Sequence, residues 1–135
     1  MPPREEEMRK EIFGKSFFKY TRSQALSDGV LFDLSSIALE AGVKSSVACT
    51  PGVKALLEVP AGLENCQDEK DRTWDVLITL YFAIKLFPAR VDRLPFHTLF
   101  QKKPNEKPEL VDLRAYFHPG DDGEPVITIT LPHDD

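Results

Sequence analysis

The last quarter of the chain has the clearest pattern of apolar and polar positions. Apolar side chains alternate with polar ones along residues 110–117 and 126–131, on either side of the acidic turn at 119–125. A period of two is typical of strands that bury one face. The positions expected to face inward are Val111, Leu113, Ala115, Phe117, Ile127, Ile129 and Leu131, and those expected to face water include Thr128 and Thr130. Residues 94–101 alternate less regularly. Short loops join the three segments, so the pattern predicts an antiparallel meander with one wet face.

A helical pattern precedes the meander, over residues 68–87. Its expected apolar stripe consists of Trp74, Leu77, Ile78, Tyr81 and Ile84. Acidic residues in the first turn and Lys85 near the end complement the helix dipole, and Pro88 is expected to end the helix. A helix must bury its apolar stripe, and the inner face of the meander is the place available for it.

The first half of the chain predicts several short elements. Thr21 and Gln24 have the spacing of a capping box, and Gly29 and Gly42 suit the left-handed ends of two helices. The expected elements are a helix from Thr21 to Gly29, a strand at 30–34, a helix at 37–41 capped by Ser35 or Ser36, a strand at 47–49, and a helix from Pro51 to about Glu58 after the cap Thr50.

Together these elements predict an α+β fold. Short N-terminal helices and a strand are followed by one long helix, which packs on a C-terminal three-stranded antiparallel meander. At 135 residues the default is one domain, at 13–132, after a flexible charged tail at 1–12. The aromatic residues expected to anchor the tail to the core are Phe13, Phe17, Phe18 and Tyr20.

Charge and composition narrow the classes of function. With 22 acidic and 17 basic residues the net charge is −5, which argues against generic binding of duplex DNA. The N-terminus has no signal-peptide pattern, and no apolar run is long enough to cross a membrane. The two cysteines, Cys49 and Cys66, form no disulfide framework, so a reduced cytoplasmic setting is expected. The acidity permits a basic or protein partner, or a nucleic-acid mimic, and the plain alternative is that it only keeps the protein soluble. No motif in the sequence implies a cofactor.

Several separate motifs occur in an order that resembles a known family. They are residues 20–35 (YTRSQALSDGVLFDLS), 40–42 (EAG), 47–50 (VACT), Asp68 with 74–77 (WDVL), and 120–129 (GDDGEPVITI). Together they resemble a family of small proteins of unknown function carried on bacterial plasmids, phages and integrated elements. The resemblance implies an accessory protein of a mobile element, and it carries over no activity and no site residues. Residues 88–107 lie outside the pattern.

Cys49 is a weak candidate for a nucleophile. It directly precedes the helix start at Thr50 and Pro51, where the helix dipole would lower the pKa of a thiol. A catalytic cysteine also needs a base, and the sequence identifies none. The alternative is a small buried side chain, as free cysteines usually are.

The acidic turn offers two further candidate sites. His118, Asp121 and Asp122 could hold a metal ion, although the spacing matches no calcium loop. His133 and the last two aspartates could contribute ligands, but we expect them to form a polar frayed end. Asp121, Asp122 and Glu124 could instead form a rigid anionic tip that pairs with Arg or Lys of a partner. Ordinary turn chemistry is the plain alternative.

Two other groups have a structural and a functional interpretation. Asp33 could line a site at a strand end, or cap the following helix by accepting its amides. Trp74, Tyr81 and Phe82 could stack on bases, or lie in the core.

Two functions of different class follow from these candidates. One is a non-enzymatic module that binds a host or element-encoded protein, in its sharpest form an anti-defence protein acting against restriction or CRISPR-type effectors. The other is a small enzyme that uses Cys49 or a metal held by residues 118–124. The sequence does not indicate an oligomeric state.

Overall fold

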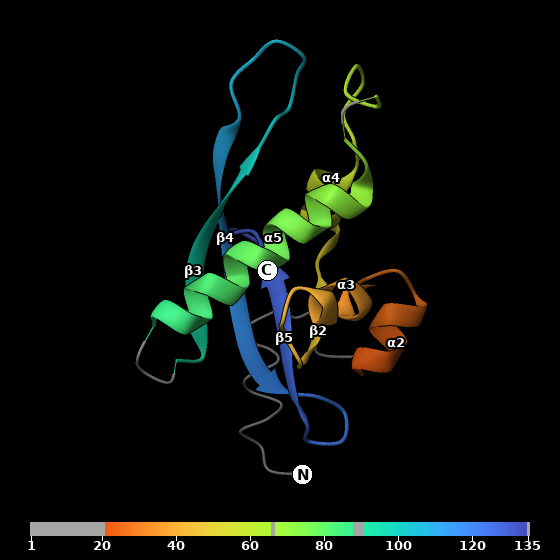
Figure 1. The fold of residues 1–135 in the computed structure, drawn as a ribbon. Coiled ribbons are helices and arrows are strands. Elements are labelled where there is room, and N and C mark those ends of the chain that lie inside the picture. The colour runs from red at the N-terminus through yellow and green to blue at the C-terminus, as the bar shows by residue number, and fades with distance from the viewer. Residues whose placement is uncertain (1–20, 66, 88–90, 135) are drawn as a thin grey trace.

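The computed structural model describes residues 21–65, 67–87 and 91–134 (Figure 1). The expectations for the tail, the aromatic cluster, Cys66 and Pro88 lie outside these residues. The elements in chain order are α2 (Arg22–Ser27), β1 (Phe32–Asp33), α3 (Ser35–Glu40), β2 (Ser46–Cys49), α4 (Pro51–Leu57), α5 (Glu69–Leu86), β3 (Arg93–Phe100), β4 (Glu109–Pro119) and β5 (Pro125–Thr130).

The strands form one mixed sheet of five, in the order β1-β2-β5-β4-β3. The C-terminal meander is confirmed, because β4 pairs antiparallel with both β3 and β5. The sheet continues beyond it: β2 pairs parallel with β5, with Val47 opposite Ile127, and β1 closes the far edge. The sequence did not indicate this pairing, since it joins segments about eighty residues apart.

The long helix α5 packs on the inner face of the meander, as predicted (Figure 1). All seven positions expected to face inward lie in the core or pack against it. The fully buried side chains contributed by α5 are Val76, Leu77 and Leu80. The α+β class and the position of the long helix are therefore confirmed.

Trp74 is a correction to the predicted stripe. Its exposed fraction is 37%, and it does not belong to the core cluster. Leu77 is buried, whereas Ile78, Tyr81 and Ile84 are only partly buried. The reason is that α5 carries apolar side chains on both sides, so the helical period alone does not select which side faces the sheet.

The face of the sheet opposite to α5 is also less exposed than predicted. Thr128 and Thr130 are buried, although the alternating pattern placed them in water. Two causes are visible. β5 lies between β2 and β4 in the interior of the sheet, and α2 covers part of this face, where Ala25 packs with Ala48 and Arg22 reaches Thr128.

Most local signals in the first half are confirmed. Thr21 and Gln24 form the capping box, and Gly29 and Gly42 have φ of 74° and 99°. A side chain at Gly42 would also crowd the Tyr81 ring, since an added Cβ would lie 3.0 Å from it. The strand around Phe32 is shorter than expected, at two residues.

The start of α3 differs from the prediction. The helix begins at Ser35 itself, and neither Ser35 nor Ser36 caps it; the N-cap residue is Leu34. The Asp33 carboxylate accepts the Ser35 amide at 3.1 Å and its hydroxyl at 2.6 Å. This contact agrees with the capping interpretation of Asp33.

Arg72 is a buried charge that ties three segments together. Its guanidinium donates to the carbonyls of Leu56 and Gln101 and to the side chain of Gln67, and it lies 5.1 Å from the centre of the Phe100 ring. Burial lowers the pKa of Arg72, and Asp75 partly offsets that effect. No helix within the described ranges is long and apolar enough to cross a membrane.

Candidate functional site

The acidic turn at 119–125 joins β4 to β5, and one of its carboxylates has a structural role. Asp121 accepts the backbone amides of Arg22 at 2.8 Å and Ser23 at 2.9 Å. These are the first two amides of α2, which have no partner within the helix. The Thr21 hydroxyl accepts the amide of Gln24 at 3.0 Å. The turn therefore helps to cap a helix that lies about a hundred residues earlier in the chain.

The side chain of Arg22 strengthens the same connection. It donates to the Thr128 hydroxyl at 2.9 Å and to the Ile127 carbonyl at 3.0 Å, on the strand that follows the turn. Burial lowers the pKa of Arg22, whereas the charges of Asp33, Asp121 and Glu124 act against that change. Part of the negative charge of the turn thus stabilises a cation of the same chain.

All three carboxylates of the turn are exposed, and Asp122 and Glu124 are the two that accept no amide of α2. The turn is closed by a hydrogen bond from the Gly120 amide to the Glu124 carbonyl at 2.7 Å, and Gly123 has a φ of 82°. Glu124 folds back to accept the Asp122 amide at 3.0 Å. No hydrogen bond or ion pair to the Asp122 carboxylate is found in the described part of the chain.

Gly120 differs from Gly123 in its role in the turn. Its φ is not positive, unlike that of Gly123. A Cβ at Gly120 would collide with the Glu124 carboxylate. The glycine therefore makes room for the folded-back side chain instead of supplying a left-handed backbone.

The structure does not bring the candidate metal ligands together. The Nε2 atom of His118 lies 2.8 Å from the Thr128 hydroxyl, and Nδ1 lies 3.2 Å from the Pro119 carbonyl oxygen. Asp121 is engaged with α2. Among the described residues no three His, Cys, Asp or Glu side chains are grouped so that they could hold a metal ion.

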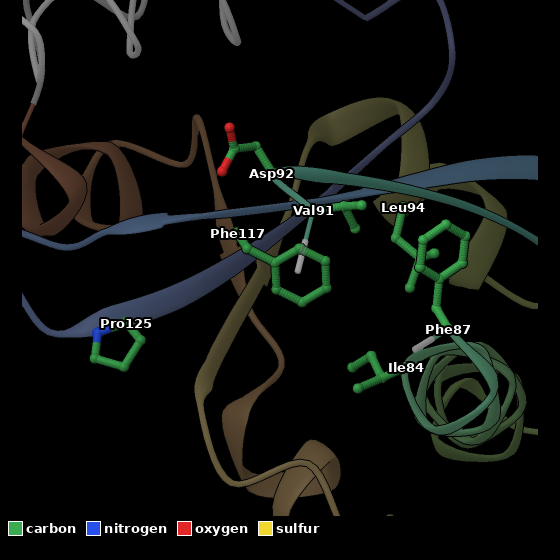
Figure 2. A pocket seen from close by; sticks show the side chains of 7 residues that line it. All are labelled: Ile84, Phe87, Val91, Asp92, Leu94, Phe117 and Pro125. Atoms are coloured by element: carbon green, nitrogen blue, oxygen red, sulfur yellow. The ribbon is translucent and has the colours of Figure 1, made fainter. Parts of the chain in front are cut away.

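An apolar cavity of about 510 Å³ lies beside the turn, at the end of α5 (Figure 2). Its lining residues are Ile84, Phe87, Val91, Asp92, Leu94, Phe117 and Pro125. In Figure 2 the side chains of Ile84, Leu94 and Phe87 converge near the Phe117 ring, and the Asp92 carboxylate points away from them. We call this hollow the Phe117 cavity.

The Phe117 cavity and the acidic turn form one continuous surface. A smaller hollow of about 310 Å³ shares Phe117 and Pro125 with the cavity, and it is also lined by Pro119 and Gly123 of the turn. The sequence does not indicate the cavity, because its walls come from α5, from the start of β3 and from the β4–β5 hairpin. The sequence does predict that Phe117 faces inward and that Ile84 lies on the apolar stripe of the helix, but it does not indicate that the two line one cavity.

Cys49 lies in the core and not at a reactive surface. It is completely buried. Burial raises the pKa of its thiol from 9.0 to about 12, although the charge of Lys54 acts in the opposite direction. The surroundings of Cys49 therefore favour the structural alternative over an acidified nucleophile.

The C-terminal aspartate Asp134 also has a structural role. Its carboxylate accepts the Thr50 hydroxyl at 2.6 Å and the Leu131 amide at 3.0 Å. Thr50 is the N-cap residue of α4, so Asp134 lies where the helix dipole favours a negative charge. The prediction of a frayed end is wrong for Asp134, whereas His133 is exposed.

The chain was compared with protein-family models, with curated proteins and with solved structures, and none of these comparisons gives a match.

Proposed function

We propose that this chain is a non-enzymatic protein-binding module whose contact surface is the Phe117 cavity together with the acidic turn. The partner presents a short segment that combines one large apolar side chain with a neighbouring Arg or Lys. The apolar side chain enters the cavity, and the cation pairs with Asp122 and Glu124. The observation that carries this proposal is the continuity between the cavity and the turn, through Phe117 and Pro125.

The cavity supports the apolar half of the proposal. Sites that anchor ligands or side chains are concave, mostly apolar and about 300–1,000 Å³ in volume. The Phe117 cavity, at about 510 Å³, lies within that range, and among the described residues that line it only Asp92 is charged. Phe87 in its wall is 45% exposed, which makes it available to a partner. Buried aromatic anchors supply much of the affinity of protein interfaces.

The different roles of the three carboxylates in the turn support the charged half of the proposal. Asp121 caps α2 and holds the turn in place. Asp122 is exposed and caps no helix. Glu124 is also exposed, and it accepts the Asp122 amide within the turn. A fixed pair of carboxylates loses little conformational entropy when a cation binds, and charge complementarity gives specificity.

The biological setting of the proposal rests on the motif resemblance alone. In that setting the chain is an accessory protein of a mobile element, and its partner is a host or element-encoded protein. Occupying a restriction or CRISPR-type effector is the anti-defence form of this role. An effector segment that normally contacts nucleic acid is rich in Arg and Lys, which suits a carboxylate pair beside an apolar cavity.

The experiment is affinity capture from bacterial lysate with three forms of the protein, followed by mass spectrometry. The variant Asp122→Asn with Glu124→Gln removes two charges, and the Gln side chain can still accept the Asp122 amide. Its control, Glu58→Gln with Glu106→Gln, removes two exposed charges elsewhere. We expect a partner that the wild type and the control retain and the turn variant loses. Equal retention by all three would exclude the turn as a contact surface.

A second variant separates the two halves of the site. Phe87→Ser removes an exposed part of the cavity wall and leaves the turn intact. Loss of the same partner supports a composite site. Retention by Phe87→Ser together with loss by the turn variant would reduce the site to the turn alone.

A further inference from the structure

The outward face of α5 carries an apolar ridge that faces away from the sheet. The ridge consists of Trp74, Ile78 and Phe82, spaced four residues apart along one side of the helix; the two aromatic residues are exposed, and Ile78 between them is partly buried against the core. Phe82 is 56% exposed and Trp74 is 37% exposed. The Phe82 ring meets that of Tyr81 edge to face at 5.6 Å, which holds it in place. Exposed aromatic side chains in such a row are typical of an interface.

The charges beside the ridge are arranged with opposite signs at its two ends. Asp71 and Asp75 lie toward the start of α5, and Lys85 lies toward its end. Asp71 and Lys85 lie seven residues to either side of Ile78, and Trp74 and Phe82 lie four residues to either side of it. These four positions are therefore symmetric about Ile78, whereas Asp75 has no charged counterpart, since Tyr81 lies at the equivalent position on the other side.

We infer that this face binds a second copy of the same chain, with the two α5 helices antiparallel and the two-fold axis at Ile78. In a two-fold contact, if residue i meets residue j, then j also meets i. Antiparallel α5 helices centred on Ile78 place Trp74 against Phe82 of the partner. The same arrangement places Asp71 opposite Lys85 of the partner, twice in each dimer.

Charge complementarity favours a second copy over a different partner. A parallel arrangement would bring Asp71 against Asp71, whereas the antiparallel one pairs unlike charges at both ends. At the acidic end the pKa of Asp75 is raised, first by burial and then by Asp71, and Arg72 offsets this only in part. A lysine supplied by the second copy would relieve that repulsion. Lys85 now lies 5.5 Å from the Tyr81 ring, close to the ridge.

The size of the ridge sets the expected strength. An 18-residue helix is about 27 Å long. A contact limited to two such helices lies at the small end of specific interfaces, so we expect a reversible dimer with a micromolar dissociation constant. The ridge shares no residue with the Phe117 cavity or the acidic turn, although Ile84 and Phe87 of the cavity wall flank Lys85 at the end of α5.

Sedimentation equilibrium of the full chain, from micromolar to millimolar concentration, tests the inference. The wild type should shift reversibly from monomer to dimer, and Phe82→Glu should raise the dissociation constant by about tenfold or more, because it buries a charge at a central contact. Leu99→Glu is the matched control: Leu99 is 58% exposed on β3, and the strand's buried side chains, such as Thr98 and Phe100, alternate with it and face the other way. It should leave the dimer unchanged. A wild type that stays monomeric at millimolar concentration would overturn the inference, as would a dimer that Phe82→Glu leaves unchanged.

A charge exchange tests the antiparallel orientation. Asp71→Lys and Lys85→Glu should each weaken the homodimer, since each creates two like-charge contacts. Mixed in equal amounts, the two variants should form a heterodimer close to the wild type in strength, because every contact again joins unlike charges. If the mixture dimerises no better than either variant alone, the antiparallel register is wrong.

Discussion

Asp121 provides the sharpest test of how the acidic turn is built. The carboxylate accepts the first two amides of α2, at 2.8 and 2.9 Å. Replacing an N-capping side chain with Ala costs about 0.5–2 kcal/mol. Both bonds are exposed to solvent, so we place Asp121→Ala at about 1–2 kcal/mol, within that range. Asp121→Asn retains one acceptor oxygen and should lose less than Asp121→Ala.

The assay is thermal and urea unfolding followed by circular dichroism. A loss of 1 kcal/mol lowers the midpoint by about 3–6 °C in a domain of this size. Asp122→Ala is the matched control, since it removes a neighbouring carboxylate that caps no helix, and it should stay within about 0.5 kcal/mol of the wild type. If Asp121→Ala and Asp122→Ala unfold at the same midpoint, the capping role assigned to Asp121 is wrong.

Three further predictions concern the core. Leu77→Ala should lower the free energy of unfolding by about 3 kcal/mol and Trp74→Ala by clearly less, because Leu77 is fully buried and Trp74 is 37% exposed. Both are measured by urea unfolding in dilute solution. A larger loss for Trp74→Ala than for Leu77→Ala would put Trp74 in the core. Arg72→Ala should cost about 3 kcal/mol in the same assay, since it leaves the part-buried carbonyls of Leu56 and Gln101 without their donors. A neutral result would mean that water replaces the guanidinium. In a Cys66→Ser background the Cys49 thiol should resist a thiol reagent at neutral pH until the protein unfolds. The pKa of this thiol rises from 9.0 to about 12 on folding, so the unfolded chain loses the proton first as pH rises. The free energy of unfolding should therefore fall above pH 9 by about 1.4 kcal/mol per pH unit. This fall should be smaller in Cys49→Ala.

The predictable part of the fold is the part with local signals. The capping box at Thr21 depends on residues three positions apart, and the boundaries of α5 follow from Asp68 and the helical period. The meander follows from alternation and short loops. These features need no knowledge of distant contacts, so the sequence was sufficient to predict them.

The features that the sequence did not predict depend on distant contacts. The pairing of β2 with β5 and the bonds from Asp121 to α2 join residues about eighty and a hundred positions apart. The exposed side of α5 was misjudged because Trp74, Ile78 and Phe82 repeat every four residues, as Val76 and Leu80 do on the buried side. Which of two such rows is buried depends on the elements that pack against the helix.

The candidate site also has a part that the sequence predicts and a part that depends on distant contacts. The turn was predicted, and its three carboxylates were treated as one anionic tip. The structure separates Asp121, which caps α2, from Asp122 and Glu124, which accept no amide of α2. A variant that neutralises all three would therefore mix a loss of stability with a loss of recognition, and the pair Asp122 and Glu124 is the cleaner test.

Selection from a random peptide library displayed on phage tests the proposed site most directly. The bait is the immobilised wild type, and parallel selections use Phe87→Ser and the double variant of Asp122 and Glu124. The proposed site predicts that the wild type enriches peptides with a large apolar residue beside Arg or Lys, and that both variants lose this enrichment. If the wild type enriches no such peptides, or if both variants enrich the same ones, the Phe117 cavity and the acidic turn are not a protein-binding site.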